Sequence, residues 1–185
     1  MKQLKMIRGN ISLPQQQLPE GYHYAFYKGT EQEIDDWLEI CSNGLISDKN
    51  RAIFEKAITN HPDLVPEQDL FFVTDETGKR VATSAGIQKS NGDGYIHMVA
   101  ALPECRSKGI GRAMLSFALS LLSDRGCHKI ILTTDDHRLA AIKTYLDAGF
   151  KPVIYSDEQD DMKLRWDEVI KNLGYKKAVT YIKEL

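Results

Sequence analysis

Hydrophobic residues recur at helical spacing in the first third of the chain. Thr30 and Glu33 have the T-x-x-E spacing of a capping box, and the apolar positions that follow predict a helix that ends near Gly44. A second helix is predicted to begin near Ser47 or Asp48 and to end at Asn60-His61-Pro62. Both helices precede the main run of strands.

From residue 70 onward, short apolar runs typical of strands alternate with amphipathic segments. Strands are expected at 22–28, 70–74, 80–88, 95–102, 129–134 and 150–155, and helices at about 110–124, from Asp135 or Asp136 through Ala148, and at 164–174. This order predicts an α/β (α+β) fold, in which helices pack on a mixed sheet. Without an internal repeat or a linker, 1–185 is expected to form a single domain.

Composition and charge narrow the class of protein. The 185 residues are 42% hydrophobic and carry a formal net charge of -2, so binding to nucleic acid through bulk charge is not expected. There is neither a signal-peptide pattern nor an apolar run of about 20 residues, so no membrane association is expected. Cys41, Cys105 and Cys127 are too widely spaced for a C-x-x-C metal site, which predicts reduced thiols, a cytoplasmic location and no metal.

Two glycines stand where the predicted helix at 110–124 begins, although glycine is a poor helix residue. Gly109 and Gly111 would let an anion approach the unpaired N–H groups at the helix N-terminus, and Arg106, Lys108 and Arg112 add positive charge. The alternative is a simple strand-to-helix turn. The spacing fits neither a P-loop nor a Rossmann fingerprint.

The residues R-x-x-G-x-G at Arg106–Gly111 are followed by A-x-x-x-Y-x-x-x-G-F at Ala141–Phe150. Together these motifs resemble the GNAT superfamily of acyl-CoA-dependent N-acetyltransferases. The specific motifs cover about residues 95–150, and the flanking segments match the family more weakly. The resemblance implies a mixed, mostly antiparallel central sheet flanked by helices, with the cofactor at a splay between two central strands.

The resemblance also assigns residues to acetyl-CoA, the implied acyl donor. Tyr145 takes the place of the general acid that protonates the departing thiolate, although a core aromatic is the alternative at this position. Arg138 stands where many members carry Asn, so it could bond the pantetheine arm, a phosphate or an acidic substrate, or lie on the surface. The implied cofactor-binding residues are Val99, Ala100, Ala101, Arg106, Ser107, Lys108, Gly109, Ile110, Gly111, Arg112, Arg138 and Tyr145.

A base is expected because an alkylammonium must lose a proton before its nitrogen can attack. His97, on the predicted central strand, is the leading candidate, and the alternative is a strand histidine with a satisfied hydrogen bond. Asp93 and Glu104 are weaker candidates, and ordered water is a further alternative. Cys105 beside a helix N-terminus has the setting of a nucleophile, but no partner is positioned for it by the sequence.

These observations predict an N-acetyltransferase that moves an acetyl group from acetyl-CoA directly to a primary amine of a small molecule or a protein. The alternative is a non-catalytic acyl-CoA-binding sensor or regulatory module of the same fold. We expect a cofactor core at about 70–155 and acceptor selection by the helices at about 30–62. A homodimer is the expected assembly.

Overall fold

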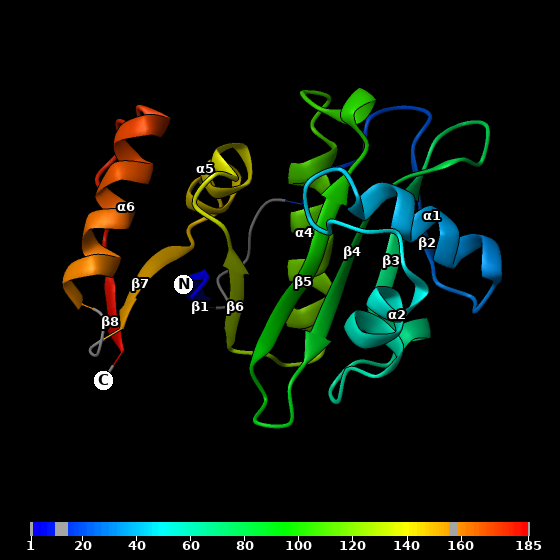
Figure 1. The fold of residues 1–185 in the computed structure, drawn as a ribbon, viewed down its shortest axis with the longest axis horizontal. Coiled ribbons are helices and arrows are strands. Elements are labelled where there is room, and N and C mark those ends of the chain that lie inside the picture. The colour runs from blue at the N-terminus through cyan, green and yellow to red at the C-terminus, as the bar shows by residue number, and fades with distance from the viewer. Residues whose placement is uncertain (1, 10–14, 156–158, 185) are drawn as a thin grey trace.

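The computed structural model describes residues 2–9, 15–155 and 159–184 and is built around one eight-stranded sheet of order β2-β3-β4-β5-β6-β1-β7-β8 (Figure 1). The strands are β1 (Leu4–Gly9), β2 (His23–Phe26), β3 (Leu70–Thr74), β4 (Arg80–Gln88), β5 (Gly94–Ala101), β6 (Lys129–Thr134), β7 (Lys151–Tyr155) and β8 (Ile182–Glu184). Neighbours run antiparallel except for the β5–β6 and β7–β8 pairs. The predicted mixed, mostly antiparallel sheet is confirmed.

Helices cover both halves of the sheet. They are α1 (Glu31–Cys41), α2 (Arg51–Phe54), α3 (Pro66–Asp69), α4 (Ile110–Asp124), α5 (Leu139–Asp147) and α6 (Gln159–Leu173), with a π-helical turn η1 (Glu55–Thr59) and a 3-10 turn η2 (Pro103–Cys105). Figure 1 shows α1 and α2 in front of β3–β5 and α4 behind them. On the other half of the sheet, α6 contacts both β7 and α5. One large apolar core joins these layers.

The capping box predicted for the first helix is present. The Glu33 N–H donates to the Thr30 hydroxyl at 3.3 Å, and the Glu33 carboxylate accepts from the Thr30 N–H at 3.0 Å. The predicted start of the second helix is wrong. Asn50, rather than Ser47 or Asp48, caps α2, because its side chain accepts a hydrogen bond from the Ala52 N–H at 2.9 Å.

The expected cap of the helix that carries Tyr145 is also wrong. α5 begins at Leu139, and neither Asp135 nor Asp136 caps it. Instead, the Asp136 carboxylate is held by the guanidinium of Arg165 on α6, at 2.6 and 2.9 Å. The Asp136 carboxylate, which the local sequence predicted to cap α5, instead forms an ion pair with an arginine that is distant in the sequence.

The strand β1 is absent from the sequence-based expectation. It lies in the interior of the sheet and pairs antiparallel with β6 over its whole length, from Leu4 opposite Thr134 to Gly9 opposite Lys129. On its other side only Met6 and Ile7 pair with β7. Leu4 and Met6 are completely buried, so this short segment forms part of the core.

The sheet opens between β5 and β6. These parallel strands are paired only over Gly94–Ile96 and Ile130–Leu132. Beyond that point β6 continues beside β1, whereas β5 continues beside β4 as far as Ala101. The ends of the two central strands therefore diverge, and the predicted splay is present.

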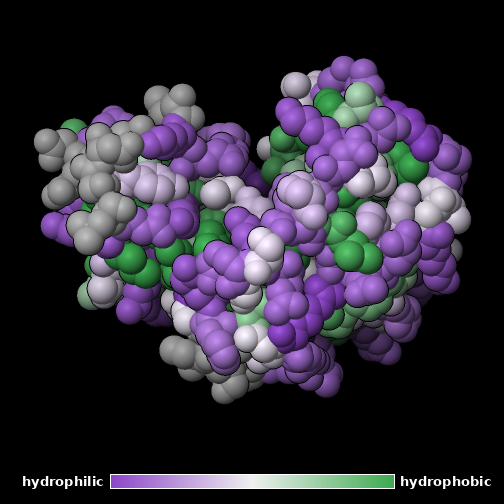
Figure 2. All heavy atoms as spheres, turned by 90° about the horizontal axis from the view of Figure 1, so that it is seen from below, coloured by the Kyte–Doolittle hydropathy of each residue, from purple (hydrophilic) through white to green (hydrophobic). Residues whose placement is uncertain are grey.

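The outer surface is mainly hydrophilic on the face drawn in Figure 2, where hydrophobic residues form only small groups. In the described ranges, Val65 and Leu164 are the large hydrophobic residues that are exposed, at 47% and 68%. No helix within those ranges has the length and apolar character needed to cross a bilayer.

Replacing Met6 by Ala tests the interior position of β1. Because the Met6 side chain is fully buried between neighbouring strands, Met6→Ala is expected to lower the free energy of unfolding by about 2–5 kcal/mol. Urea denaturation followed by circular dichroism measures the change. Val65→Ala, at an exposed position, is the control and should change it by less than about 0.5 kcal/mol. Equal stability of Met6→Ala and wild type would contradict the placement of β1.

Candidate active site

A cleft of about 910 Å³ lies where β5 and β6 separate. Its walls come from the turn after α1, the end of β5, the glycine turn and first residues of α4, and one side of α5 from Leu139 to Tyr145. The lining residues include Asn43–Leu45, Val99–Ala101, Cys105–Ser107, Gly109, Gly111, Arg112, Met114, His137–Ala141, Thr144 and Tyr145. Both motifs singled out in the sequence therefore face one cavity.

The glycine turn presents free backbone N–H groups to this cleft. Gly109 is the N-cap of α4 with φ +85°, and its carbonyl accepts the first helical hydrogen bonds, from the N–H groups of Arg112 and Ala113 at 3.1 Å. The N–H groups of Ile110 and Gly111 precede those bonds and have no partner within the helix. A Cβ added at Gly109 or Gly111 would meet no atom within 4 Å, so it would project into open space. This cradle suits a phosphate group.

A bulge in β5 redirects the backbone that lines the opposite wall. Thr83 pairs with Ala100 and Ala85 with His97, so that two residues of β5, Met98 and Val99, lie opposite one residue of β4. Met98 has φ 53°, a left-handed conformation that is uncommon for a residue with a side chain. Such bulges re-aim backbone and side chains next to active sites. Here the bulge directly precedes the cleft-lining stretch that begins at Val99.

The motif A-x-x-x-Y-x-x-x-G-F fixes the position of the Tyr145 ring. Gly149 adopts φ +86° at the end of α5, where its N–H donates to the Leu146 carbonyl at 3.0 Å and the Phe150 N–H donates to the Tyr145 carbonyl at 3.0 Å. These two bonds form a Schellman motif, which normally includes an apolar contact between the same two outer residues. The Phe150 ring supplies that contact, edge-on to the Tyr145 ring with centroids 6.0 Å apart.

The Tyr145 side chain is buried, but its hydroxyl remains available as a donor. The residue is 4% exposed and lines the cleft, and in the part of the chain that the structure describes its hydroxyl has no hydrogen-bond partner. Burial raises the pKa of Tyr145 above 10, against the opposing effect of the Arg138 charge. The phenol is therefore protonated at neutral pH and can donate a hydrogen bond into the cleft.

Positive charge dominates the cleft. Arg106, Arg112 and Arg138 line it, and no carboxylate is among the described residues that do so. The guanidinium Nη2 of Arg138 donates to the Val99 carbonyl at 2.8 Å, which bridges the mouth from α5 to β5. The cleft is thus suited to an anionic ligand.

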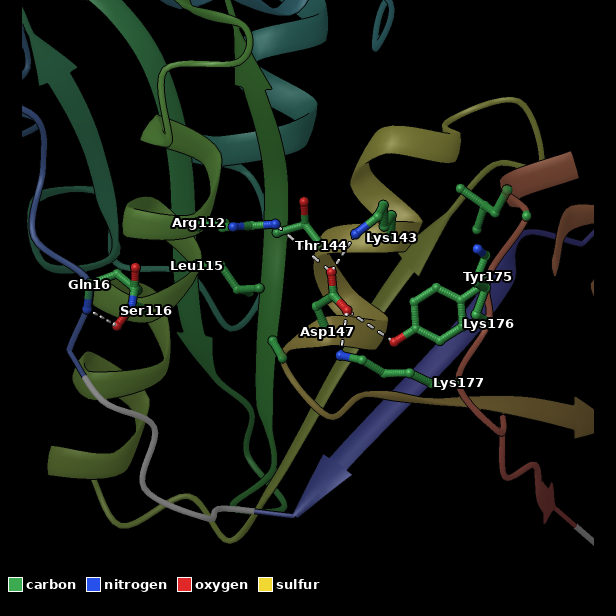
Figure 3. A pocket seen from close by; sticks show the side chains of 13 residues that line it. Gln16, Arg112, Leu115, Ser116, Lys143, Thr144, Asp147, Tyr175, Lys176 and Lys177 are labelled. Carbon is green, nitrogen blue, oxygen red and sulfur yellow. Dashed lines mark hydrogen bonds and ion pairs between the residues drawn. The ribbon is translucent and has the colours of Figure 1, made fainter.

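A second hollow of about 600 Å³ adjoins the first, because Arg112 and Thr144 line both. Figure 3 shows side chains of α4, α5 and the segment after α6 facing this space. Hydrogen bonds from Lys143, at 2.7 Å, and from Lys177 and Tyr175, each at 3.1 Å, hold the Asp147 carboxylate and lower its pKa to about 2. With Arg112 and Lys176, the lining carries four cations and one carboxylate.

The family model described as the Acetyltransferase (GNAT) family matches residues 31–150, which include the glycine turn and the whole of α5 with Tyr145. The chain belongs to the GNAT acetyltransferase family.

Curated relatives and solved structures agree with this assignment. The chain is 27% identical to the mycothiol acetyltransferase of Pseudarthrobacter chlorophenolicus over 80% of its own length and 48% of that protein. It is 28% identical to that of Thermobispora bispora over 75% of its length and 49% of that protein, so it spans about half the length of these curated relatives.

Similarity to solved structures supports the fold. A GCN5-related N-acetyltransferase from Sphaerobacter thermophilus superposes with a TM-score of 0.64 at 20% identity, over 80% of this chain and 47% of that one. The ribosomal-protein-S18-alanine N-acetyltransferase from Escherichia coli gives a TM-score of 0.57 at 18% identity, over 69% of this chain and 76% of that one.

Two of the residues expected to bind the cofactor of this GNAT chain do not present their side chains to the cleft. The Lys108 ammonium donates to the Tyr22 hydroxyl at 3.3 Å. The Ile110 side chain is completely buried in the core, so only its backbone N–H is available. The other expected residues all line the cleft.

His97 is not among the cleft-lining residues. Its Nε2 lies 3.1 Å from the Ala57 carbonyl in η1, and its ring is 5.4 Å from that of His61. Burial lowers the pKa of His97 to about 4, so the ring is neutral at pH 7 and a weak base. Its assignment as the catalytic base stays a prediction.

The weaker candidates for the catalytic base form ion pairs with lysines. Asp93 pairs with Lys129 at 2.8 Å, and Glu104 pairs with Lys79 at 3.1 Å.

Cys105 lines the cleft, but burial raises the pKa of its thiol, which disfavours the thiolate. Across the described ranges, no group of three or more His, Cys, Asp or Glu side chains could hold a metal ion.

The sequence alone missed several residues that line the cleft, notably Asn43, Leu45 and His137. Asn43 and Leu45 flank Gly44, which has φ +111° in the turn after α1. That glycine was the available signal, although it indicates only a turn. His137 precedes α5 and is exposed.

The half-buried, neutral His97 predicts a pH-dependent stability for this GNAT chain. Its folded pKa of about 4 lies below the ordinary value of 6.5, so the unfolded state binds the proton more readily between these values. Its contribution is complete above pH 6.5 and is lost as the pH falls towards 4, about 3 kcal/mol in all. Urea denaturation between pH 4 and 7 should show a flatter dependence for His97→Gln. The exposed-site control His128→Gln should follow wild type, and an equal slope in all three would contradict the prediction.

Proposed function

We propose that the chain is an N-acetyltransferase that moves an acetyl group from acetyl-CoA to a primary amine. The observation that carries the proposal is that the free N–H groups before α4 and the unpartnered Tyr145 hydroxyl open into one positively charged cleft. Family membership supports the same activity. A solved relative, the NatC complex bound to Gag peptide and CoA, is similar over 69% of this chain with a TM-score of 0.57.

Acetyl-CoA supplies an activated acyl group and a thiolate leaving group. The N–H groups of Ile110 and Gly111, with the Arg106 and Arg112 side chains, bind the diphosphate at the helix N-terminus. A backbone N–H at the bulge in β5 polarises the acyl carbonyl, and one such fixed donor contributes roughly 3–4 kcal/mol to catalysis. Tyr145 donates its hydroxyl hydrogen towards the sulfur.

The second hollow extends this site beyond the diphosphate. Coenzyme A carries a 3′-phosphate on its nucleotide end, and the cations around Asp147 provide a complementary charge. Because Arg112 and Thr144 border both spaces, the nucleotide end continues from the glycine turn into this hollow. Lys176 and Lys177, which follow α6, form its outer wall.

The acceptor is a primary amine of a small molecule or a protein. Its proton is removed by water or by a side chain before attack. The turn after α1, with Asn43 and Leu45, forms the cleft wall that belongs to the expected acceptor-selecting part of the chain. The alternative function is a non-catalytic acyl-CoA sensor, which would need the cradle but not the Tyr145 hydroxyl.

Adding a side chain to the glycine cradle should prevent cofactor binding. Gly111 has ordinary helical φ, and its Cβ position is open, so Gly111→Val is expected to fold but to displace the diphosphate. We expect acetyl-CoA affinity, measured by titration calorimetry, to fall at least about tenfold, the cost of one charge-assisted hydrogen bond. Gly9→Val adds the same side chain at another open position and is the control. Unchanged affinity of Gly111→Val would contradict the proposed cradle.

Removing the Tyr145 hydroxyl distinguishes the enzyme from the sensor. Tyr145→Phe should still bind acetyl-CoA, but its amine-dependent release of free thiol should fall by at least about 10²-fold, as for loss of a positioned acid. A panel of primary amines provides the acceptors. If wild type binds acetyl-CoA and acetylates none of them, the sensor is the better description.

The outer lysines should recognise the 3′-phosphate. Replacing both Lys176 and Lys177 by Gln is expected to weaken CoA binding roughly fivefold to tenfold through lost charge attraction. Dephospho-CoA, which lacks that phosphate, should bind the variant and wild type equally. An equal loss for both ligands would place the nucleotide end elsewhere.

A further inference from the structure

Arg138 lines the cleft although it lies outside both motifs, three residues before Ala141. It is the N-cap residue of α5, and its Nη2 donates to the Val99 carbonyl at 2.8 Å on the bulged end of β5. The same helix carries Tyr145 into the cleft. The guanidinium therefore lies between the backbone that polarises the acyl group and the helix that carries the hydroxyl.

The charge of Arg138 is available to a ligand. No carboxylate of the described residues pairs with it, and none lines the cleft. Its positive charge acts to lower the pKa of both Tyr145 and Cys41, against the larger effect of burial. The bond to the Val99 carbonyl and the charge effect on Tyr145 place the guanidinium in the part of the cleft that also contains the Tyr145 side chain. Four of its five N–H donors remain after the bond to Val99.

Proton affinities show why a cation is needed there. Burial raises the pKa of Tyr145 above its ordinary value, and a phenol is ordinarily a weaker acid than a thiol. Complete proton transfer from this phenol to a thiolate is therefore unfavourable. The hydroxyl donates a hydrogen bond while the sulfur keeps most of its negative charge. A fixed positive charge nearby stabilises that state.

We propose that Arg138 is a further catalytic residue, whose guanidinium binds the coenzyme A sulfur as that atom becomes an anion. The amine lone pair forms the new C–N bond, the C–S bond breaks with its electron pair on sulfur, and the proton of the acetylated nitrogen leaves to water. Arg138 transfers no proton, because a guanidinium does not deprotonate in proteins. The inference rests on the proposed function and adds a partner for Tyr145.

Coenzyme A itself, bound without turnover, reports the effect. The fraction of its thiol that is ionised is followed by the ultraviolet absorbance of the thiolate as the pH is raised, at saturating protein. Wild type should give the bound thiol a pKa at least about one unit below that of free coenzyme A, which is tenfold more thiolate at a given pH. Arg138→Gln should return it towards the free value, and Arg138→Lys should retain most of the shift.

Controls separate this inference from cofactor binding. Lys129→Gln removes one positive charge at the opposite end of β6, where Lys129 pairs with Asp93, and should leave the thiol pKa unchanged. Desulfo-coenzyme A, which has no thiol, should bind Arg138→Gln and wild type with similar affinity. An unshifted thiol in wild type, or one equally shifted in Arg138→Gln, overturns the role of Arg138. No binding of coenzyme A to wild type would instead contradict the proposed function.

Discussion

The interrupted hydrogen-bond ladder between β5 and β6 is the constraint on which the site depends. The two strands pair through only three residues each, and beyond them β6 pairs with β1. Backbone groups at the open end of β5 must then find other partners, because unpaired polar groups are costly to bury. The Val99 carbonyl finds the Arg138 guanidinium. The cleft is therefore a gap in the sheet that is lined by polar backbone groups, and the Arg138 guanidinium spans it from α5 to β5.

Three helix ends surround this gap, and each contributes in a different way. The N-terminus of α4 has N–H groups without helical partners, and the glycines there leave them uncovered. The turn after α1 forms a side wall, and α5 carries Tyr145. Gly109 and Gly111 keep side chains out of the cradle. Gly149 and Phe150 instead hold the Tyr145 side chain in place. Each motif thus has a structural role in the site in addition to its value for recognising the family.

The elements that depend on local interactions could be predicted from the sequence. The Thr30–Glu33 box and the β3–β4 hairpin are made by residues close together in the chain, and the structure contains both. The elements that depend on distant partners could not. Asp136 is held by Arg165 on α6, and β1 becomes an interior strand only because β6, more than 120 residues later, pairs with it.

The same distinction applies to the site. The glycine turn and Tyr145 belong to contiguous motifs, and their shared cleft follows from the family resemblance. Asn43 and the outer lysines Lys176 and Lys177 reach the two cavities only through tertiary packing. Partial burial also lowers the pKa of His97. Part of this environment comes from η1, which is far from His97 in the sequence. No local pattern indicates such an environment.

The Schellman closure of α5 has a consequence for dynamics. Helix termini are among the first parts of a native protein to open, with free energies well below that of global unfolding. Tyr145 lies in the last turn of α5, and its own carbonyl is an anchor of that closure. Fraying of this helix end would release the ring from Phe150 and move the hydroxyl out of register with the cleft. Amide hydrogen exchange at Gly149 and Phe150, whose N–H groups make the two bonds of this closure, would report such a local opening.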